Sequence, residues 1–166
     1  MTHPIVVAHS GSGLLLPAIA RAVKAGMQVF VAAWIPNGAN SLMDELSAGP
    51  ERIFHSDWLG QDPVTDPDVA RSFLFHDCSA EVADWATTTL RTFYPAKVYT
   101  EVVQPAAECR SAAIVPLGDR TLRWEWMAEA ARDRLGVEPH MIPGGHCPHV
   151  SRPDQLAELI ERVADT

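Results

Sequence analysis

Short runs of consecutive apolar residues recur along the chain, separated by longer segments of helical composition. The runs are PIVVA (residues 4–8), MQVFVAA (27–33), SAAIVPL (111–117) and a weaker one, VEPHMI (137–142). Apolar runs without an alternating polar face are typical of strands that are buried on both sides in a parallel sheet. We therefore predict four strands at these positions.

The segments between these runs predict helices with recognisable ends. Gly26 and Gly136 each follow a helical segment and are typical stop signals. Ser79 is a predicted helix cap, and Pro153 opens the last helix, with Ser151 as a candidate cap before it. The predicted helices cover residues 11–25, 79–93, 121–136 and 151–164.

Strands that alternate with helices predict an α/β fold, in which about four parallel strands are flanked by helices. Residues 34 to about 70 interrupt this alternation, because they are rich in Pro, Gly, Asn, Asp and Ser. They are predicted to form a loop with short helical pieces. Right-handed crossovers bring the carboxyl ends of parallel strands to one edge of the sheet, where we expect any functional site.

Composition and charge restrict the class of protein. A chain of 166 residues, with 47% hydrophobic and 20% charged residues, fits one ordinary globular domain. Its 21 acidic and 13 basic residues give a net charge of -8, which repels phosphate, so we expect no nucleic-acid partner. We also expect no membrane association, because the sequence has no basic cluster and no apolar stretch that approaches ~18 residues.

Two further features predict a cytoplasmic location. The opening residues MTHPIVVAHS lack a basic start, and their apolar run is too short for a secretory leader. The three cysteines, Cys78, Cys109 and Cys147, are an odd number at wide spacings, which argues against a disulfide framework. We therefore expect a reducing compartment.

The stretch VVAHSGSGLLL carries the first candidate chemistry. A serine at a sharp turn from strand to helix exposes its hydroxyl, and the turn requires small residues two positions before and after it. Around Ser10 these positions hold Ala8 and Ser12, and the backbone N–H of Gly11 is the predicted donor to an oxyanion. Ser12 fits less well as a nucleophile, because bulky Leu14 lies two positions after it. The alternative is a glycine-rich turn without a nucleophile, such as a phosphate loop.

A nucleophilic serine needs a base, and the base needs a carboxylate that orients it. Among seven histidines, His146 lies on a Gly-Gly turn directly after the fourth predicted strand, where a catalytic imidazole is expected. The alternatives are a structural loop histidine or a metal ligand together with Cys147 and His149. Asp119 directly follows the third predicted strand and is the candidate carboxylate. Its alternative role is to cap the helix that begins near Thr121.

With its candidate residues in the chain order Ser, Asp, His, the sequence resembles the α/β-hydrolase superfamily. Within it, the chain is similar to esterase-like members akin to plant methylesterases and hydroxynitrile lyases. The resemblance rests on VVAHSGSG, VPLGDRTLRWEW and IPGGHCPHVSRPDQLAELI, and FLFHDCSAEVADWA is similar to the family's cap. It implies a single domain with a partial α/β-hydrolase fold, whose core spans 1–36 and 101–166 and whose cap-like segment spans 37–100.

The resemblance also implies roles for individual residues. Ser10 would be the nucleophile, His146 the base and Asp119 the acid that orients it, with the backbone of Gly11 in the oxyanion hole. The cap would cover a pocket for a small-molecule substrate. The candidates for lining this pocket are Trp34, Trp58, His76 and Trp85. The alternative, which is more common for aromatic side chains, is that they belong to the core.

The family pattern includes parts that this sequence does not display. Members carry several strands before the serine, together with a loop that supplies a second oxyanion donor, and the loss of one such donor costs roughly 10²–10³ in rate. A start upstream of Met1 is one alternative. In the sequence as given, the first strand would lie at the sheet edge without a central Lys or Pro. We therefore predict a homodimer through the edge near residues 4–9.

Three functions fit the sequence. The first is a serine hydrolase, without a cofactor or a metal, that acts on an ester, thioester or lactone of a small apolar substrate. The second is a lyase, cyclase or isomerase, in which His146 shuttles protons and Ser10 only binds the substrate. The third is a non-catalytic pseudo-hydrolase.

Overall fold

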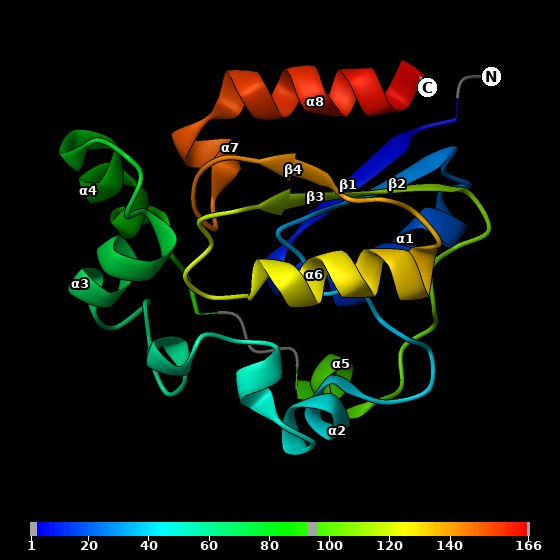
Figure 1. The fold of residues 1–166 in the computed structure, drawn as a ribbon, viewed down its shortest axis with the longest axis horizontal. Helices are drawn as coiled ribbons and strands as arrows, with labels where there is room; N and C mark the ends of the chain where they lie inside the picture. The colour runs from blue at the N-terminus through cyan, green and yellow to red at the C-terminus, as the bar shows by residue number, and fades with distance from the viewer. Residues whose placement is uncertain (1–2, 93–95, 166) are drawn as a thin grey trace.

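The computed structural model describes residues 3–92 and 96–165. Its four strands form one parallel sheet in the order β1-β2-β3-β4, which confirms the predicted α/β fold. Figure 1 shows the sheet at the centre of the molecule, with helices on both of its faces. The last strand is shorter than predicted. The strands are β1 (Ile5–His9), β2 (Met27–Val31), β3 (Arg110–Pro116) and β4 (His140–Ile142).

Two layers of helices cover the sheet. Helices α1 (Leu16–Ala22) and α6 (Trp124–Ala130) lie on one face, and α8 (Pro153–Asp165) lies on the other (Figure 1). Alternate residues of β2 enter different cores, since Val29 packs with residues of α8 and Phe30 packs with residues of α1 and α6. Every residue of β2 is buried, which explains why its sequence is almost continuously apolar.

Two helices differ from their predicted bounds. The predicted helix 11–25 consists of a 3-10 turn, η1 (Ser10–Leu14), followed by α1. The predicted helix 121–136 starts later, as α6, and continues into a π-helical turn, η5 (Ala131–Leu135). Gly136 follows with a φ of 68°, in the left-handed region that favours glycine, which confirms it as the stop.

The predicted final helix is divided in two. A single turn, α7 (Pro148–Ser151), precedes α8, which starts at Pro153 as predicted. The prediction of Ser151 as a cap is wrong, because this residue ends α7 and its hydroxyl donates a hydrogen bond to the carbonyl of Cys147 at 3.4 Å. Across residues 3–92 and 96–165, no helix combines the length and the apolar character that a membrane crossing requires.

The segment 37–100 is built from short helices and turns. In Figure 1, α3 and α4 lie beyond the carboxyl ends of the strands, and α2 and α5 lie together below α6. Ser79 caps α4 as predicted, because its hydroxyl accepts a hydrogen bond from the N–H of Val82 at 3.3 Å. This helix is shorter than predicted, and position 93 lies outside the described residues. The bounds are α2 (Leu42–Ser47), η2 (Pro50–Arg52), η3 (Ser56–Trp58), α3 (Pro67–Val69), η4 (Ala70–Leu74), α4 (Ala80–Thr89) and α5 (Ala96–Thr100).

Strand β1 lies at one edge of the sheet, as the sequence predicts. Within the part of the chain that the structure describes, it pairs only with β2. Ile5 and Val7 are 42% and 46% exposed, although both belong to a strand. Among the described residues, this edge thus has exposed apolar side chains and backbone groups without a partner strand.

Candidate active site

The turn after β1 has the geometry of a nucleophile elbow. Ser10 has a φ of 56°, a left-handed conformation that is costly for a residue with a side chain. The carbonyl of Ser10 accepts a hydrogen bond from the N–H of Trp34 at 3.1 Å, and a Cβ at Gly13 would overlap the carbonyl of Trp34. The strained turn is thus held by the segment that follows β2, as expected for a serine at such a turn.

Ser12 has a structural part in the same turn. Its hydroxyl donates a hydrogen bond to the carbonyl of His9 at 2.6 Å and accepts one from the N–H of His9 at 3.0 Å. Both contacts close the turn around Ser10. Of the two serines in the stretch, Ser10 is therefore the one whose hydroxyl faces a base.

The imidazole of His146 lies between Ser10 and Asp119. Its Nε2 lies 2.9 Å from the hydroxyl oxygen of Ser10, and its Nδ1 lies 2.7 Å from Oδ2 of Asp119. Each of these side chains lies at the carboxyl end of a different strand, as the sequence predicts. A carboxylate can only accept a hydrogen bond, so Nδ1 carries the proton and donates to Asp119. Nε2 is then unprotonated and accepts a hydrogen bond from the Ser10 hydroxyl. The three residues therefore form a connected hydrogen-bonded chain.

Asp119 contacts both His146 and the backbone of its own turn, but the prediction that it caps a helix is wrong, because α6 starts at Trp124 with Arg123 at its cap position. While Oδ2 accepts from His146, Oδ1 accepts hydrogen bonds from the N–H groups of Thr121 and Leu122 at 2.7 and 3.1 Å. Burial raises the pKa of this carboxyl, but the charge and hydrogen bonds of His146 and the hydrogen bonds of Thr121 outweigh burial and hold the pKa below its usual value. Asp119 is therefore ionised beside the imidazole at neutral pH.

Thr121 completes the contacts around the imidazole. Its hydroxyl donates to Oδ1 of Asp119 at 2.9 Å, and the same oxygen lies 2.9 Å from Nδ1 of His146. Thr121 is 2% exposed, so water does not compete for these contacts. The sequence analysis missed this residue, although a threonine two positions after an aspartate is a recognisable turn signal.

Two more histidines adjoin His146. The ring of His9 lies 4.7 Å from that of His146 and 4.6 Å from that of His149, measured between centroids. Burial, followed by the charges of His146 and His149, lowers the pKa of His9 to about 3. Burial, followed by the charge of His146, also lowers the pKa of His149. Both flanking rings are therefore neutral at pH 7.

His76 connects the segment 37–100 to the loop that carries Asp119. Its Nε2 donates a hydrogen bond to the carbonyl of Gly118 at 2.9 Å. The sequence analysis placed His76 among the candidates for lining the pocket, but in the structure it lies outside both cavities described below. Its side chain instead contacts the backbone of Gly118, the residue before Asp119.

The next residue, Asp77, holds the loop that carries His146. Its Oδ2 accepts a hydrogen bond from the N–H of Gly145 at 2.9 Å and pairs with the guanidinium of Arg152 at 3.3 Å. The Asp77 side chain is only 10% exposed. The segment 37–100 therefore contacts both loops that supply the hydrogen-bonded chain.

Two cavities meet at Ser10. The smaller, of about 290 Å³, and the larger, of about 660 Å³, share five lining residues: Ser10, Gly11, Trp58, Tyr99 and His146. Leucine and aromatic side chains dominate the smaller cavity, which is also lined by Trp34, Leu42, Phe54, Thr121 and Leu122. The junction of the two cavities thus coincides with the Ser10 hydroxyl.

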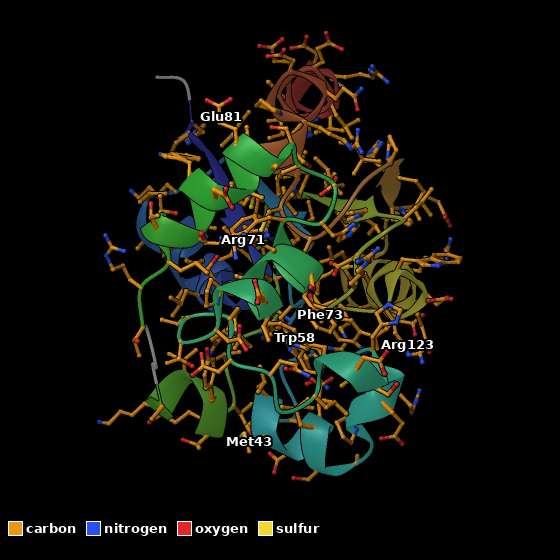
Figure 2. All side chains as sticks on the ribbon, turned by 90° about the vertical axis from the view of Figure 1, so that its left-hand side faces the viewer. Met43, Trp58, Arg71, Phe73, Glu81 and Arg123 are labelled. Atoms are coloured by element: carbon orange, nitrogen blue, oxygen red, sulfur yellow. The ribbon has the colours of Figure 1, made fainter. Side chains whose placement is uncertain are left out.

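Three of the four aromatic candidates from the sequence analysis line these cavities. Trp34 lines the smaller cavity, Trp85 lines the larger one while being 62% exposed, and Trp58 lines both. Figure 2 labels Trp58 and Phe73, whose ring centroids are 5.4 Å apart. This ring pair anchors Trp58 against η4, next to the site.

The described residues give no support for the alternative that His146 is a metal ligand. Among the described residues, no three His, Cys, Asp or Glu side chains are grouped so that they could hold a metal ion. Cys147 is packed in an apolar cluster with Leu74 and Phe75, and burial raises the pKa of its thiol. This cysteine is therefore part of the core.

Comparisons with solved structures agree with this fold. Polyneuridine aldehyde esterase superposes with a TM-score of 0.79 at 16% identity, over 98% of this chain and 72% of that protein. Tomato methylketone synthase I in complex with 2-tridecanone gives a TM-score of 0.71 at 18% identity, over 98% and 71%. A pyrethroid hydrolase gives 0.69 at 18% identity, over 98% and 70%. At these identities the likeness establishes the fold.

Comparison at the level of sequence gives the family. No curated protein matches the chain. The model of the alpha/beta hydrolase family, however, matches residues 1–159, which include the elbow, the Asp119 loop and the His146 loop. This chain therefore belongs to the alpha/beta hydrolase family.

Proposed function

We propose that this protein is a serine hydrolase that cleaves an ester, thioester or lactone by way of an acyl-enzyme. The observation that carries the proposal is the hydrogen-bonded chain from Ser10 through His146 to Asp119, with Ser10 strained at the junction of two cavities. Family membership supports it, as does the similarity of the fold to an esterase and a pyrethroid hydrolase.

In the first half of the reaction, the Ser10 oxygen bonds to the substrate's carbonyl carbon while its proton moves to Nε2 of His146. The carbonyl π electrons move to oxygen, and the N–H of Gly11 donates a hydrogen bond to that oxyanion. Asp119 stabilises the imidazolium through Nδ1. The tetrahedral intermediate then collapses, and the leaving group departs with the proton from Nε2.

In the second half, water attacks the acyl-enzyme. His146 removes a proton from the water as the new carbon–oxygen bond forms, and it returns this proton to Ser10 when the acid is released. The proposed chemistry uses groups of the protein and water. No cofactor takes part in this proposal.

The cavities suggest the class of substrate. The smaller cavity, of about 290 Å³, is lined by Trp34, Leu42, Phe54 and Leu122, which suits a small apolar or aromatic group. The larger cavity has room for the rest of the substrate on the other side of Ser10. We propose a small apolar substrate whose reactive carbonyl lies between two unequal groups.

Labelling with a fluorophosphonate tests the proposal. The reagent should add one phosphonyl group to the wild-type protein and to Ser47→Ala, but none to Ser10→Ala, as read by intact mass. Ser47→Ala is the matched control, because it removes the hydroxyl of an exposed serine that lies in α2 and lines neither cavity at Ser10. An unlabelled, folded wild-type protein would contradict the proposal.

A second proposal is proton transfer without an acyl-enzyme, because one protein with a similar fold, methylketone synthase I, is named a synthase and not a hydrolase. In that case His146 would carry the proton and Ser10 would only bind the substrate. The two functions differ in one result. Turnover that survives Ser10→Ala and is lost in His146→Ala favours proton transfer, whereas loss in both variants favours hydrolysis.

A further inference from the structure

The proposed hydrolysis needs more than one hydrogen-bond donor for the oxyanion. Hydrolases of this mechanism typically place at least two donors around the developing charge, because a single donor leaves it poorly stabilised where water is excluded. The N–H of Gly11, the residue after the nucleophile, supplies one. A second donor must lie near both Ser10 and Gly11, on the side that faces the substrate.

Tyr99 occupies that place. It belongs to α5, is half-buried, and lines both cavities together with Ser10, Gly11 and His146. Its hydroxyl oxygen lies 3.7 Å from the position that a Cβ on Gly11 would take. The Tyr99 hydroxyl therefore lies close to the backbone of Gly11.

The other hydroxyl groups near the junction each line only one of the two cavities. Ser12 and Thr89 line the larger cavity, and Thr121 lines the smaller one. Trp58, which also lines both cavities, carries no hydroxyl. Within the described residues, Tyr99 is the hydroxyl that the two cavities share with the Ser10 side chain.

Packing holds Tyr99 in position. Helix α5 contacts α2, and Tyr99 and the preceding Val98 pack against the main hydrophobic core beneath the site. Figure 1 shows α5 next to α2 at the lower end of the molecule. The phenol ring is thus supported by the core on one side while its hydroxyl faces the cavities.

We propose that the hydroxyl of Tyr99 is the second oxyanion donor of this enzyme, an inference that rests on the proposed hydrolysis. As the Ser10 oxygen bonds to the carbonyl carbon, the π electrons move to the carbonyl oxygen, which accepts hydrogen bonds from Gly11 N–H and Tyr99 O–H. Tyr99 keeps its proton throughout. When the intermediate collapses, the carbonyl re-forms and both hydrogen bonds weaken again.

The role predicts a specific pattern of kinetic loss. Tyr99→Phe removes one oxygen atom and keeps the ring, so the packing of α5 is preserved. Because the hydrogen bond strengthens only in the transition state, kcat should fall by about 10²-fold while KM changes little. The rate of phosphonylation of Ser10 by a fluorophosphonate should fall similarly, since the phosphonyl oxygen occupies the same position.

Thr100→Val is the matched control. It removes a hydroxyl from the next residue of α5, where the threonine is exposed and bonded within its own helix. This variant should keep the wild-type labelling rate and kcat. A melting temperature for each variant separates a loss of catalysis from a loss of folding.

The outcomes distinguish the two proposals. If wild-type protein is labelled and Tyr99→Phe is labelled at the same rate, the role of Tyr99 is overturned and the hydrolase proposal stands. A loss in Tyr99→Phe that is matched by Thr100→Val, or that appears only in KM, also overturns it. If the wild-type protein is neither labelled nor active on esters, the hydrolase proposal fails, and the role of Tyr99 fails with it.

Discussion

The side chain of His9 donates a hydrogen bond from Nε2 to the backbone carbonyl of His146, with 2.7 Å between the two atoms. This bond joins the end of β1, directly before Ser10, to the loop that carries the proposed base. Because His9 is buried and its pKa is lowered to about 3, the bond is made by a neutral imidazole. Protonation of His9 would place an uncompensated charge next to His146 and His149.

The first prediction concerns stability against pH. In the unfolded chain His9 has its ordinary pKa of 6.5, whereas in the folded protein the pKa is about 3. Between these values the unfolded state binds more protons, so the free energy of unfolding falls as the pH is lowered through this range. The slope from His9 alone is at most about 1.4 kcal/mol per pH unit. Urea unfolding at several pH values measures it.

His9→Gln isolates this contribution. Its side-chain amide still donates to the carbonyl of His146 but does not titrate, so stability should depend less on pH between about 3 and 6.5. His140→Gln, at an exposed histidine of β4, is the control and should keep the wild-type dependence. Equal pH dependence in His9→Gln and wild-type protein would show that His9 is not the titrating group.

The second prediction concerns Asp119. In Asp119→Asn the amide oxygen can still accept from the N–H groups of Thr121 and Leu122, but the NH₂ group faces Nδ1 of His146. The imidazole then carries its proton on Nε2 and cannot accept one from Ser10. We expect kcat for an ester to fall by about 10⁴-fold with little change in fold.

Asp62→Asn is the control for this loss. Asp62 makes comparable side-chain contacts with Val64 and Thr65 in an exposed turn, and it lines neither cavity at Ser10. Its substitution should leave kcat unchanged. If Asp119→Asn retained wild-type activity, another group would have to orient His146, and the proposed chain of three residues would be incorrect.

The sequence was informative where the chemistry is local. Four buried strands produce apolar runs, and a serine between small residues after such a run marks the elbow, so Ser10 could be located without coordinates. Asp119 and His146 were found because each directly follows a predicted strand. In a parallel sheet this single rule brings residues distant in sequence to the same edge.

Residues that act through contacts between segments were not predicted. His76 was assigned to the pocket from its type, but its hydrogen bond goes to the backbone of Gly118. Asp77 and Tyr99 were not singled out, because nothing in their own neighbourhoods indicates what they face. Short helices with few periodic positions, such as α3 and α5, give no pattern from which the path of the segment 37–100 could be derived.

The third prediction concerns Asp77. This side chain is largely buried between the N–H of Gly145 and the guanidinium of Arg152. Asp77→Ala leaves both donors without their acceptor, and we expect the free energy of unfolding to fall by about 3 kcal/mol. Because Gly145 precedes His146, kcat should also fall. Thermal unfolding and ester kinetics measure the two effects.

Asp84→Ala is the control for Asp77. Asp84 pairs with Arg71 at 2.8 Å, but both side chains are exposed, and exposed pairs contribute little. The melting temperature and kcat should stay close to the wild-type values. If Asp77→Ala behaved in the same way as Asp84→Ala, the contact between Asp77 and the His146 loop would have no part in holding the site.

The fourth prediction concerns the edge strand. We propose that two copies associate through β1, as the sequence analysis expected, because Ile5 and Val7 are exposed beside backbone groups that lack a partner strand in the described residues. Light scattering after size exclusion should give twice the mass of one chain. Val7→Lys places a charge on this edge and should give a monomer.

The matched control is Val64→Lys, at a valine that is 40% exposed in the segment 37–100, compared with 46% for Val7. Both substitutions replace an exposed valine by lysine and change the net charge equally, so only the location differs. Val64→Lys should remain a dimer. A wild-type protein that is monomeric at high concentration would show that no dimer forms through β1. Two variants that dissociate equally would show that the effect of the lysine does not depend on its place in β1, and β1 would then not be the interface.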